Sequence, residues 1–204
     1  MPSQAYAQSE LSKFQRSLQR LDNTRDRMER LFAQEQIRKV DLDSVYEALF
    51  LRAVTSFEAF LEDLFLAILV GRAQYTGQRV RVLMSASSRG ALMKILLQGS
   101  VYMNWLPFEH TEKRAKLYLR DGRPFSDLDI GDRSQLKTIS IIRNAIAHKS
   151  PYALAQFQKI VIGGAPMLQR ERNPAGFLRS RIAPQQTRFE VHMGQLARCA
   201  GLLC

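Results

Sequence analysis

Residues 42–70 constrain the fold of this chain more than any other segment, because they are apolar around most of a helical circumference. A helix with so little polar surface needs other elements packed on most of its sides. We therefore predict one long central helix, with Asp43 or Ser44 as its N-cap and Gly71 at its end. Its polar residues form one stripe, made of Arg52, Thr55, Ser56, Glu58, Glu62 and Asp63.

The rest of the chain also favours helices. Helical spacing of apolar residues and turn signals predict helices over 8–36, 86–98, 108–120, 133–148, 152–161 and 186–203. Only Ile160–Ile162 resembles a strand. We expect an all-α protein with an antiparallel helical bundle over 1–161. Residues 162–187 are rich in glycine, proline and arginine, so we expect 162–204 to be a basic irregular segment and a C-terminal helix, packed on the same domain.

The positive charge is concentrated in one region. The chain has a formal net charge of +11, and ten Lys/Arg face one acid, Glu171, between Arg133 and Arg188. Such a surface favours an anionic partner: nucleic acid or an acidic protein fits best, and an acidic membrane surface is an alternative. We expect RNA contacts from Arg133, Lys137, Lys149, Arg170, Arg172, Arg179 and Arg181. The four arginines from 170 to 181 suit an arm that follows phosphates, although a solvated loop has the same composition.

Sequence signals for secretion, membrane insertion and cofactor binding are absent, and this predicts where the protein is found and what it binds. The two cysteines, Cys199 and Cys204, form no disulfide framework, and the first residues do not read as a signal peptide. Leu64–Val70 is too short to cross a bilayer. We expect a soluble cytoplasmic protein that is not attached to a membrane, with no metal site and no cofactor, because no metal-ligand spacing or phosphate-binding loop is present.

Arg143, Asn144 and His148 are the most informative polar residues. On a helical wheel they share one half with Ser140, opposite an apolar half that contains Ile142. An imidazole transfers protons near neutral pH, and a guanidinium binds phosphate in a fork geometry. Asn144 and His148 are four residues apart and so lie within reach of each other. A structural alternative is that His148 only caps the helix and Asn144 only satisfies backbone carbonyls.

Arg143-Asn144-x-x-x-His148, at the end of an apolar helix, resembles the signature of the HEPN superfamily of ribonucleases. Residues 51–64, which include the stretch Phe57-Glu58-Ala59-Phe60-Leu61, resemble the second helix of its RiboL-PSP-like branch. The resemblance implies a helical bundle and a homodimer whose two motifs form one composite active site. It also implies metal-independent RNA cleavage, in a toxin or an antiviral defence effector. Ser150 stands where the branch paired with nucleotidyltransferase antitoxins carries Tyr, which puts that pairing in doubt.

We therefore expect an endoribonuclease that forms a 2′,3′-cyclic phosphate by attack of the ribose 2′-OH. His148 would move the proton, Arg143 would bind the phosphate, and Asn144 would orient the phosphate or the imidazole. Ser140 and Glu58 are expected to support the motif; Glu58 either holds Arg143 or belongs to the solvated stripe. An antitoxin or another partner protein is a candidate partner. Two alternatives stay open: a non-catalytic dimeric module that binds RNA or a partner protein, and a nucleotide sensor.

Overall fold

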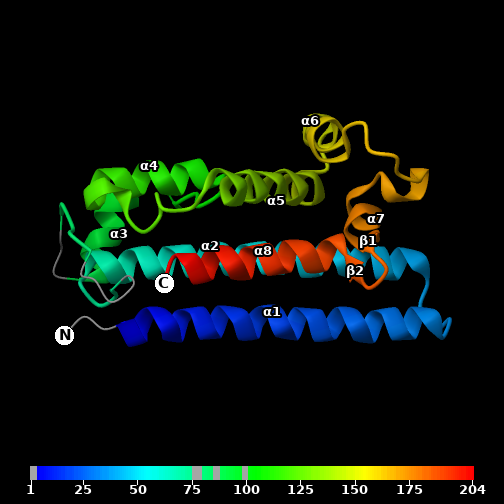
Figure 1. Ribbon diagram of the computed structural model, residues 1–204, viewed down its shortest axis with the longest axis horizontal. Helices are drawn as coiled ribbons and strands as arrows, with labels where there is room; N and C mark the ends of the chain where they lie inside the picture. The colour runs from blue at the N-terminus through cyan, green and yellow to red at the C-terminus, as the bar shows by residue number, and fades with distance from the viewer. Residues whose placement is uncertain (1–3, 75–79, 85–87, 98–100) are drawn as a thin grey trace. The chain divides into compact units, whose positions relative to one another are not determined.

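The computed structural model describes residues 4–74, 80–84, 88–97 and 101–204, and its fold is an all-α helical bundle, as predicted (Figure 1). Its α-helices are α1 (Gln4–Ala33), α2 (Lys39–Leu69), α3 (Arg89–Leu97), α4 (Phe108–Tyr118), α5 (Ile130–His148), α6 (Pro151–Gln156), α7 (Pro174–Arg179) and α8 (Arg188–Leu202). Short helical turns are η1 (Arg120–Gly122), η2 (Phe157–Ile162) and η3 (Gln169–Glu171). Strands β1 (Arg181–Ala183) and β2 (Gln186–Thr187) form one antiparallel pair. Within the described ranges, no helix has the length and apolar character needed to cross a membrane.

In α1, α2, α4, α5 and α8, the predicted helix limits lie within four residues of the observed ones. α5 begins at Ile130 instead of 133, because the Asp129 carboxylate accepts a hydrogen bond from the Asp132 backbone N–H at 2.7 Å and so caps the first turn. The strand-like residues Ile160–Ile162 are helical and belong to η2. The predicted third helix corresponds to α3, whereas its predicted ends at 86, 87 and 98 lie outside the described residues.

Contacts between Cα atoms group the chain into two compact units. The first unit comprises Met1–Gln15, Phe57–Ser134 and Ala197–Cys204, and the second comprises Arg16–Ser56 and Gln135–Leu196. Each unit therefore combines early and late parts of the chain. The assignment of 162–204 to one domain with the bundle stays a prediction.

Aromatic side chains of α2 and the segments after it form the core of the first unit. The ring of Phe65 meets Trp105 edge-on at a centroid distance of 5.4 Å and Phe125 at 5.6 Å. Trp105 is also anchored by its indole N–H, which donates to Glu62 at 3.0 Å. Such tilted aromatic pairs contribute beyond the area they bury. The predicted role of 42–70 as a core helix is therefore confirmed for this part of α2.

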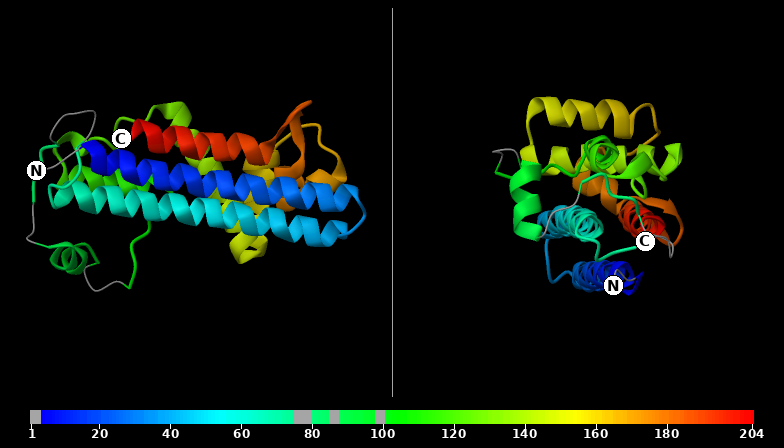
Figure 2. Two further views of the ribbon diagram at one scale, coloured as in Figure 1. Left: turned by 90° about the horizontal axis from the view of Figure 1, so that it is seen from below. Right: turned by 90° about the vertical axis from the view of Figure 1, so that its left-hand side faces the viewer.

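The second unit is built on a helical hairpin. Its parts of α1 and α2 lie side by side and antiparallel, joined by a short link (Figures 1 and 2). The first turns of α8 complete the core: Tyr46 of α2 meets Phe189 edge-on at 5.5 Å, and His192 lies between Phe50 and Phe177 at 6.0 and 6.1 Å. The unit also contains the end of α5, which carries the predicted motif.

Candidate active site

Buried apolar residues set the rotation of α5 and so determine where the motif lies. Ile139 and Ile142 are fully buried, which turns the opposite side of the helix outward. Arg143 and Asn144 are partly exposed there, and the His148 side chain is exposed in the last turn. The structure therefore brings the three predicted catalytic residues to the accessible end of one helix within the second unit.

A tight corner between α5 and α6 presents His148. Lys149 adopts a left-handed backbone conformation with φ of 48°, which ends α5. Ser150 is extended and caps α6, because its hydroxyl accepts a hydrogen bond from the Ala153 backbone N–H at 3.2 Å. Pro151 then starts α6 with its φ already fixed. The corner thus holds the imidazole at the end of a regular helix and not in a loop.

The side chains of Arg143 and Asn144 are hydrogen-bonded to each other. The Nη1 group of Arg143 donates a hydrogen bond to Oδ1 of Asn144 at 3.0 Å. The sequence suggested contact between Asn144 and His148, but no hydrogen bond joins those two side chains in the described part of the chain. This hydrogen bond orients the carboxamide and the guanidinium toward each other, one helical turn before His148. Guanidinium and amide N–H groups are donors of the kind that bind the oxygens of a phosphate.

Ser140 and Glu58, which were predicted to support the motif, differ in burial and lie in different units. Ser140 is buried with 3% of its surface exposed, so it contributes to the packing of α5 and not to its outer side. Glu58 is partly buried in the part of α2 that belongs to the first unit, whereas Arg143 belongs to the second. The idea that Glu58 holds Arg143 stays a hypothesis.

Several residues predicted to bind RNA are engaged in ion pairs. Lys149 pairs with Glu47 at 3.0 Å, which ties the α5–α6 corner to α2, and Arg133 pairs with Glu112 at 3.4 Å in the first unit. Lys137 is exposed. An ion pair lowers the net charge that a phosphate meets, so Lys137 is the better candidate for a phosphate contact among these residues.

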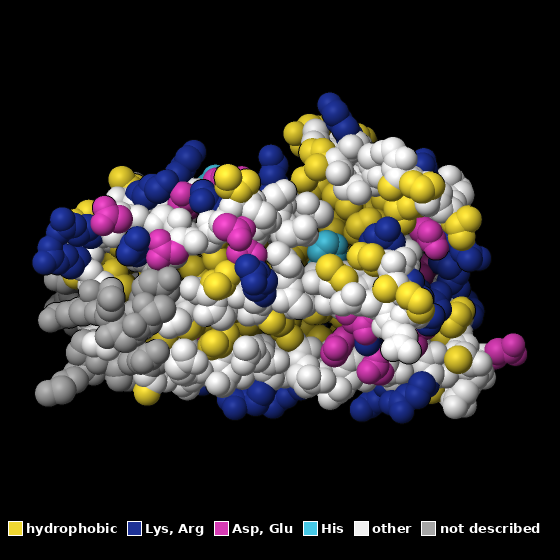
Figure 3. Space-filling model, in the orientation of Figure 1, with side chains coloured by type: hydrophobic (Ala, Val, Ile, Leu, Met, Phe, Trp, Pro, Cys, Tyr) yellow, Lys and Arg dark blue, Asp and Glu magenta, His cyan; other side chains and the backbone are white. Residues whose placement is uncertain are grey.

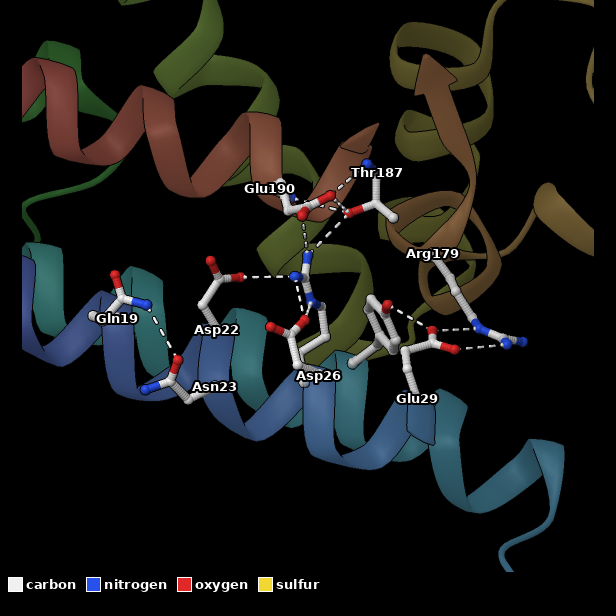
Figure 4. A network of polar contacts seen from close by, with 10 residues as sticks. Gln19, Asp22, Asn23, Asp26, Glu29, Arg179, Thr187 and Glu190 are labelled. Atoms are coloured by element: carbon white, nitrogen blue, oxygen red, sulfur yellow. Dashed lines mark hydrogen bonds and ion pairs between the residues drawn. The ribbon is translucent and has the colours of Figure 1, made fainter. Parts of the chain in front are cut away.

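Arg179 has a structural position that the sequence did not reveal. Its guanidinium donates to both oxygens of Glu29 at 2.8 and 3.1 Å, and it lies 4.5 Å from the centroid of the Phe32 ring. Burial alone would raise the pKa of Glu29, but the hydrogen bonds from Arg179 and Tyr46 lower it, so the carboxyl stays ionised. Figure 4 shows this contact between α7 and α1. Arg179 therefore fixes α7 in place.

A second ion-pair cluster lies along α1 in the same view. Arg25 has 7% of its surface exposed and pairs with Asp26, with Asp22 at 3.4 Å and with Glu190 of α8 at 2.9 Å (Figure 4). Its Nη1 group also lies 3.4 Å from the hydroxyl of Thr187. A buried guanidinium needs such partners to offset its lost hydration. Sequence reasoning missed this cluster, although the spacing of Asp22, Arg25 and Asp26 on one helix was a signal for it.

The surface near the motif is partly apolar. Tyr152 and Leu154 of α6 and Ile160 of η2 have exposed side chains, with Tyr152 at 74%. Figure 3 shows hydrophobic side chains gathered over α6. These residues follow His148 directly in the chain, so an apolar surface accompanies the motif in the second unit.

Neither a metal-binding group nor a similar known protein helps to assign the function. In the part of the chain that the structure describes, no group of three or more His, Cys, Asp or Glu side chains is placed to hold a metal ion. No family model, curated protein or solved structure matches this chain. The functional interpretation therefore depends on the residues themselves and on the motif.

Proposed function

We propose that this protein is a metal-independent endoribonuclease whose catalytic residues are Arg143, Asn144 and His148. The observation that carries the proposal is the arrangement of these three side chains on the last turns of α5, with an accessible imidazole beside a hydrogen-bonded Arg–Asn pair. The resemblance of the motif to the HEPN signature supports the same reaction. A surface with an excess of basic residues over 133–188 suits RNA as the substrate.

The reaction follows from the chemistry of these groups. The ribose 2′-oxygen attacks the adjacent phosphorus, the bond from phosphorus to the 5′-oxygen breaks, and the products are a 2′,3′-cyclic phosphate and a 5′-OH end. His148 accepts the proton of the 2′-OH or donates one to the leaving 5′-oxygen, a role that contributes about 10²–10⁴-fold. Arg143 stabilises the negative charge on the phosphate, and Asn144 holds the guanidinium or the phosphate in position.

The proposal includes a homodimer with a composite site. One chain supplies one His148, whereas the reaction removes a proton at one oxygen and delivers a proton at another. A twofold axis beside the motif would supply a second imidazole and a second guanidinium. A role as a toxin or a defence effector, with a partner or antitoxin that restrains it, is part of the same proposal and is implied by the resemblance alone.

Cleavage of labelled single-stranded RNA in the presence of EDTA tests the proposal. The wild-type protein should produce fragments that end in a 2′,3′-cyclic phosphate and should leave DNA of the same sequence intact. His148→Ala should lower the rate by at least about 10²-fold. His110→Ala is the matched control, because His110 is an exposed histidine of α4 in the first unit.

The control variant should cleave at the wild-type rate. Cleavage that needs added Mg²⁺ or Mn²⁺ would contradict the mechanism. RNA binding without cleavage by the wild-type protein would favour the non-catalytic alternative.

A further inference from the structure

The second unit contains a cavity of about 670 Å³ whose lining does not include Arg143, Asn144 or His148. Its walls come from α1, α2, η3, α7, the β1–β2 pair and the start of α8. All of these wall residues belong to the second unit. A cavity of this size is in the range that binds small ligands.

Four of the five carboxylates that line this cavity pair with basic side chains of the protein itself. Glu29 accepts hydrogen bonds from Arg179 and, at 2.8 Å, from the hydroxyl of Tyr46. Glu190 accepts from Arg25 and from Thr187. Asp43 pairs with Lys39 through one oxygen, whereas its Oδ1 has no hydrogen-bond partner among the described residues. The fifth carboxylate, that of Glu171, accepts a hydrogen bond from the Leu168 backbone N–H at 3.4 Å. Four of the five negative charges are therefore partly offset by basic side chains of the cavity itself.

Two arginines of the cavity differ from the others. Arg170 and Arg181 are exposed, and neither pairs with a carboxylate of the described residues. Arg181 uses one N–H group on the carbonyl of Pro184 at 2.9 Å, which leaves the rest of its five donors. These two guanidiniums thus supply uncommitted cationic donors at the cavity, which favour an anionic ligand.

The backbone that carries Arg170 is held in place. Its carbonyl accepts a hydrogen bond from the Asn173 side chain at 3.1 Å, and Asn173 also caps α7 by accepting from the Gly176 N–H at 2.8 Å. A Cβ atom on Gly176 would lie 2.1 Å from the Arg170 carbonyl oxygen, so only glycine allows this approach. The Arg170 backbone is therefore positioned at the cavity before a ligand binds, so binding carries no entropic cost for ordering this segment.

Arg179 supplies a flat surface in the same cavity. Its guanidinium is oriented by Glu29 and lies against Phe32, and all three residues line the cavity. Guanidinium planes and aromatic rings are the groups on which proteins stack unpaired RNA bases. The cavity therefore combines exposed phosphate-binding donors with a planar group for a base.

We propose that this cavity binds one phosphate-bearing nucleotide unit of single-stranded RNA. The phosphate lies between Arg170 and Arg181, and the base lies against the Arg179–Phe32 pair. The choice of RNA rests on the proposed ribonuclease function, whereas binding in the cavity does not require cleavage. The cavity would hold the substrate strand at a position separate from the bond that is cut.

The test is fluorescence anisotropy with a labelled 2′-O-methyl oligonucleotide, which lacks the 2′-OH nucleophile and stays intact during the measurement. Arg170→Gln/Arg181→Gln should raise the Kd about tenfold or more, because each charge-assisted hydrogen bond to a phosphate contributes strongly. The salt dependence should become shallower, by a slope of about 0.7 for each phosphate that the protein no longer neutralises. AMP should compete with the oligonucleotide and adenosine should not.

The matched control is Arg20→Gln/Lys159→Gln, which removes the same charge from the second unit at exposed residues outside the cavity lining. Its Kd should stay within about threefold of the wild-type value. Arg170→Lys/Arg181→Lys keeps the charge and should recover part of the affinity, which separates weaker phosphate binding from a folding defect.

Equal losses of affinity in the two glutamine variants would overturn the proposal, since the cavity would then add nothing to general electrostatic attraction. Competition by polyglutamate as strong as that by AMP would also overturn it, in favour of an acidic protein partner. A wild-type protein that binds the probe as described but cleaves no RNA would refute the proposed ribonuclease function and leave the cavity proposal standing.

Discussion

His192 is a buried imidazole whose two ring nitrogens have no hydrogen-bond partner in the described part of the chain. Burial, and then the nearby charge of Arg188, lower its pKa from 6.5 to about 4. The folded state therefore keeps His192 neutral, whereas the unfolded state takes up a proton below pH 6.5. Stability is unaffected by His192 above that pH and decreases as the pH falls toward the folded pKa.

His192→Leu should reduce this loss of stability at acidic pH. We expect the free energy of unfolding to fall between pH 7 and pH 5 by about 2 kcal/mol less in the variant than in the wild-type protein. Urea unfolding at the two pH values measures the difference. His110→Gln, at an exposed histidine, should behave like the wild-type protein. An unchanged pH dependence in His192→Leu would show that other groups cause the acid sensitivity.

At the scale of elements, the long helices were predictable from sequence and the segment 162–187 was not. The spacing of apolar residues in 42–70 and 133–148 shows which side of each helix is buried. That information is local, because residues three and four positions apart share one side of a helix. α7 and the β1–β2 pair depend on partners far away in the chain, such as Glu29 for Arg179. No local pattern reports that kind of contact.

Of the two candidate sites, the motif could be predicted from the sequence and the cavity could not. The residues of the motif, Arg143, Asn144 and His148, were found from their order along one helix, and the structure places them on its accessible end. The cavity was not found, because its lining combines residues from both halves of the sequence. The arginines of 162–187 look equivalent in the sequence, yet Arg179 is committed to Glu29 whereas Arg170 has no carboxylate partner among the described residues.

Gly176→Ala tests how α7 is placed. The added Cβ would meet the Arg170 carbonyl oxygen, so either α7 or η3 must move, and we expect a loss of about 1–3 kcal/mol in the free energy of unfolding. Gly194→Ala is the matched control, because a Cβ at that position of α8 has no atom within 4 Å. It should raise stability by up to about 1 kcal/mol. Equal effects of the two substitutions in urea unfolding would refute the close packing at Gly176.

At the scale of the whole molecule, we expect a homodimer of about 47 kDa, twice the chain mass of 23.4 kDa, in which both chains complete the active site. Two motifs that each carry an arginine repel each other, so apolar contacts must offset that repulsion. The exposed Tyr152 and Leu154, which follow the motif in the chain, provide such a surface. Light scattering measures the mass.

Mixing wild-type protein with an excess of His148→Ala protein, under conditions of subunit exchange, tests the shared site. Activity should fall below the value set by the wild-type concentration alone, because most wild-type chains then have an inactive partner. Activity that follows the wild-type concentration, or a fully active monomer, would show that one motif is sufficient.

The ion pairs that join α1 to late elements also set the order of events during synthesis. Arg25 contacts Thr187 across 162 residues of sequence, and Glu29 contacts Arg179 across 150. A growing chain cannot make the second contact until α7 has left the ribosome, or the first until β2 has, and closing such long loops is slow. The cavity therefore forms late in translation, so a nascent chain that already carries His148 outside the ribosome does not yet have its second binding surface.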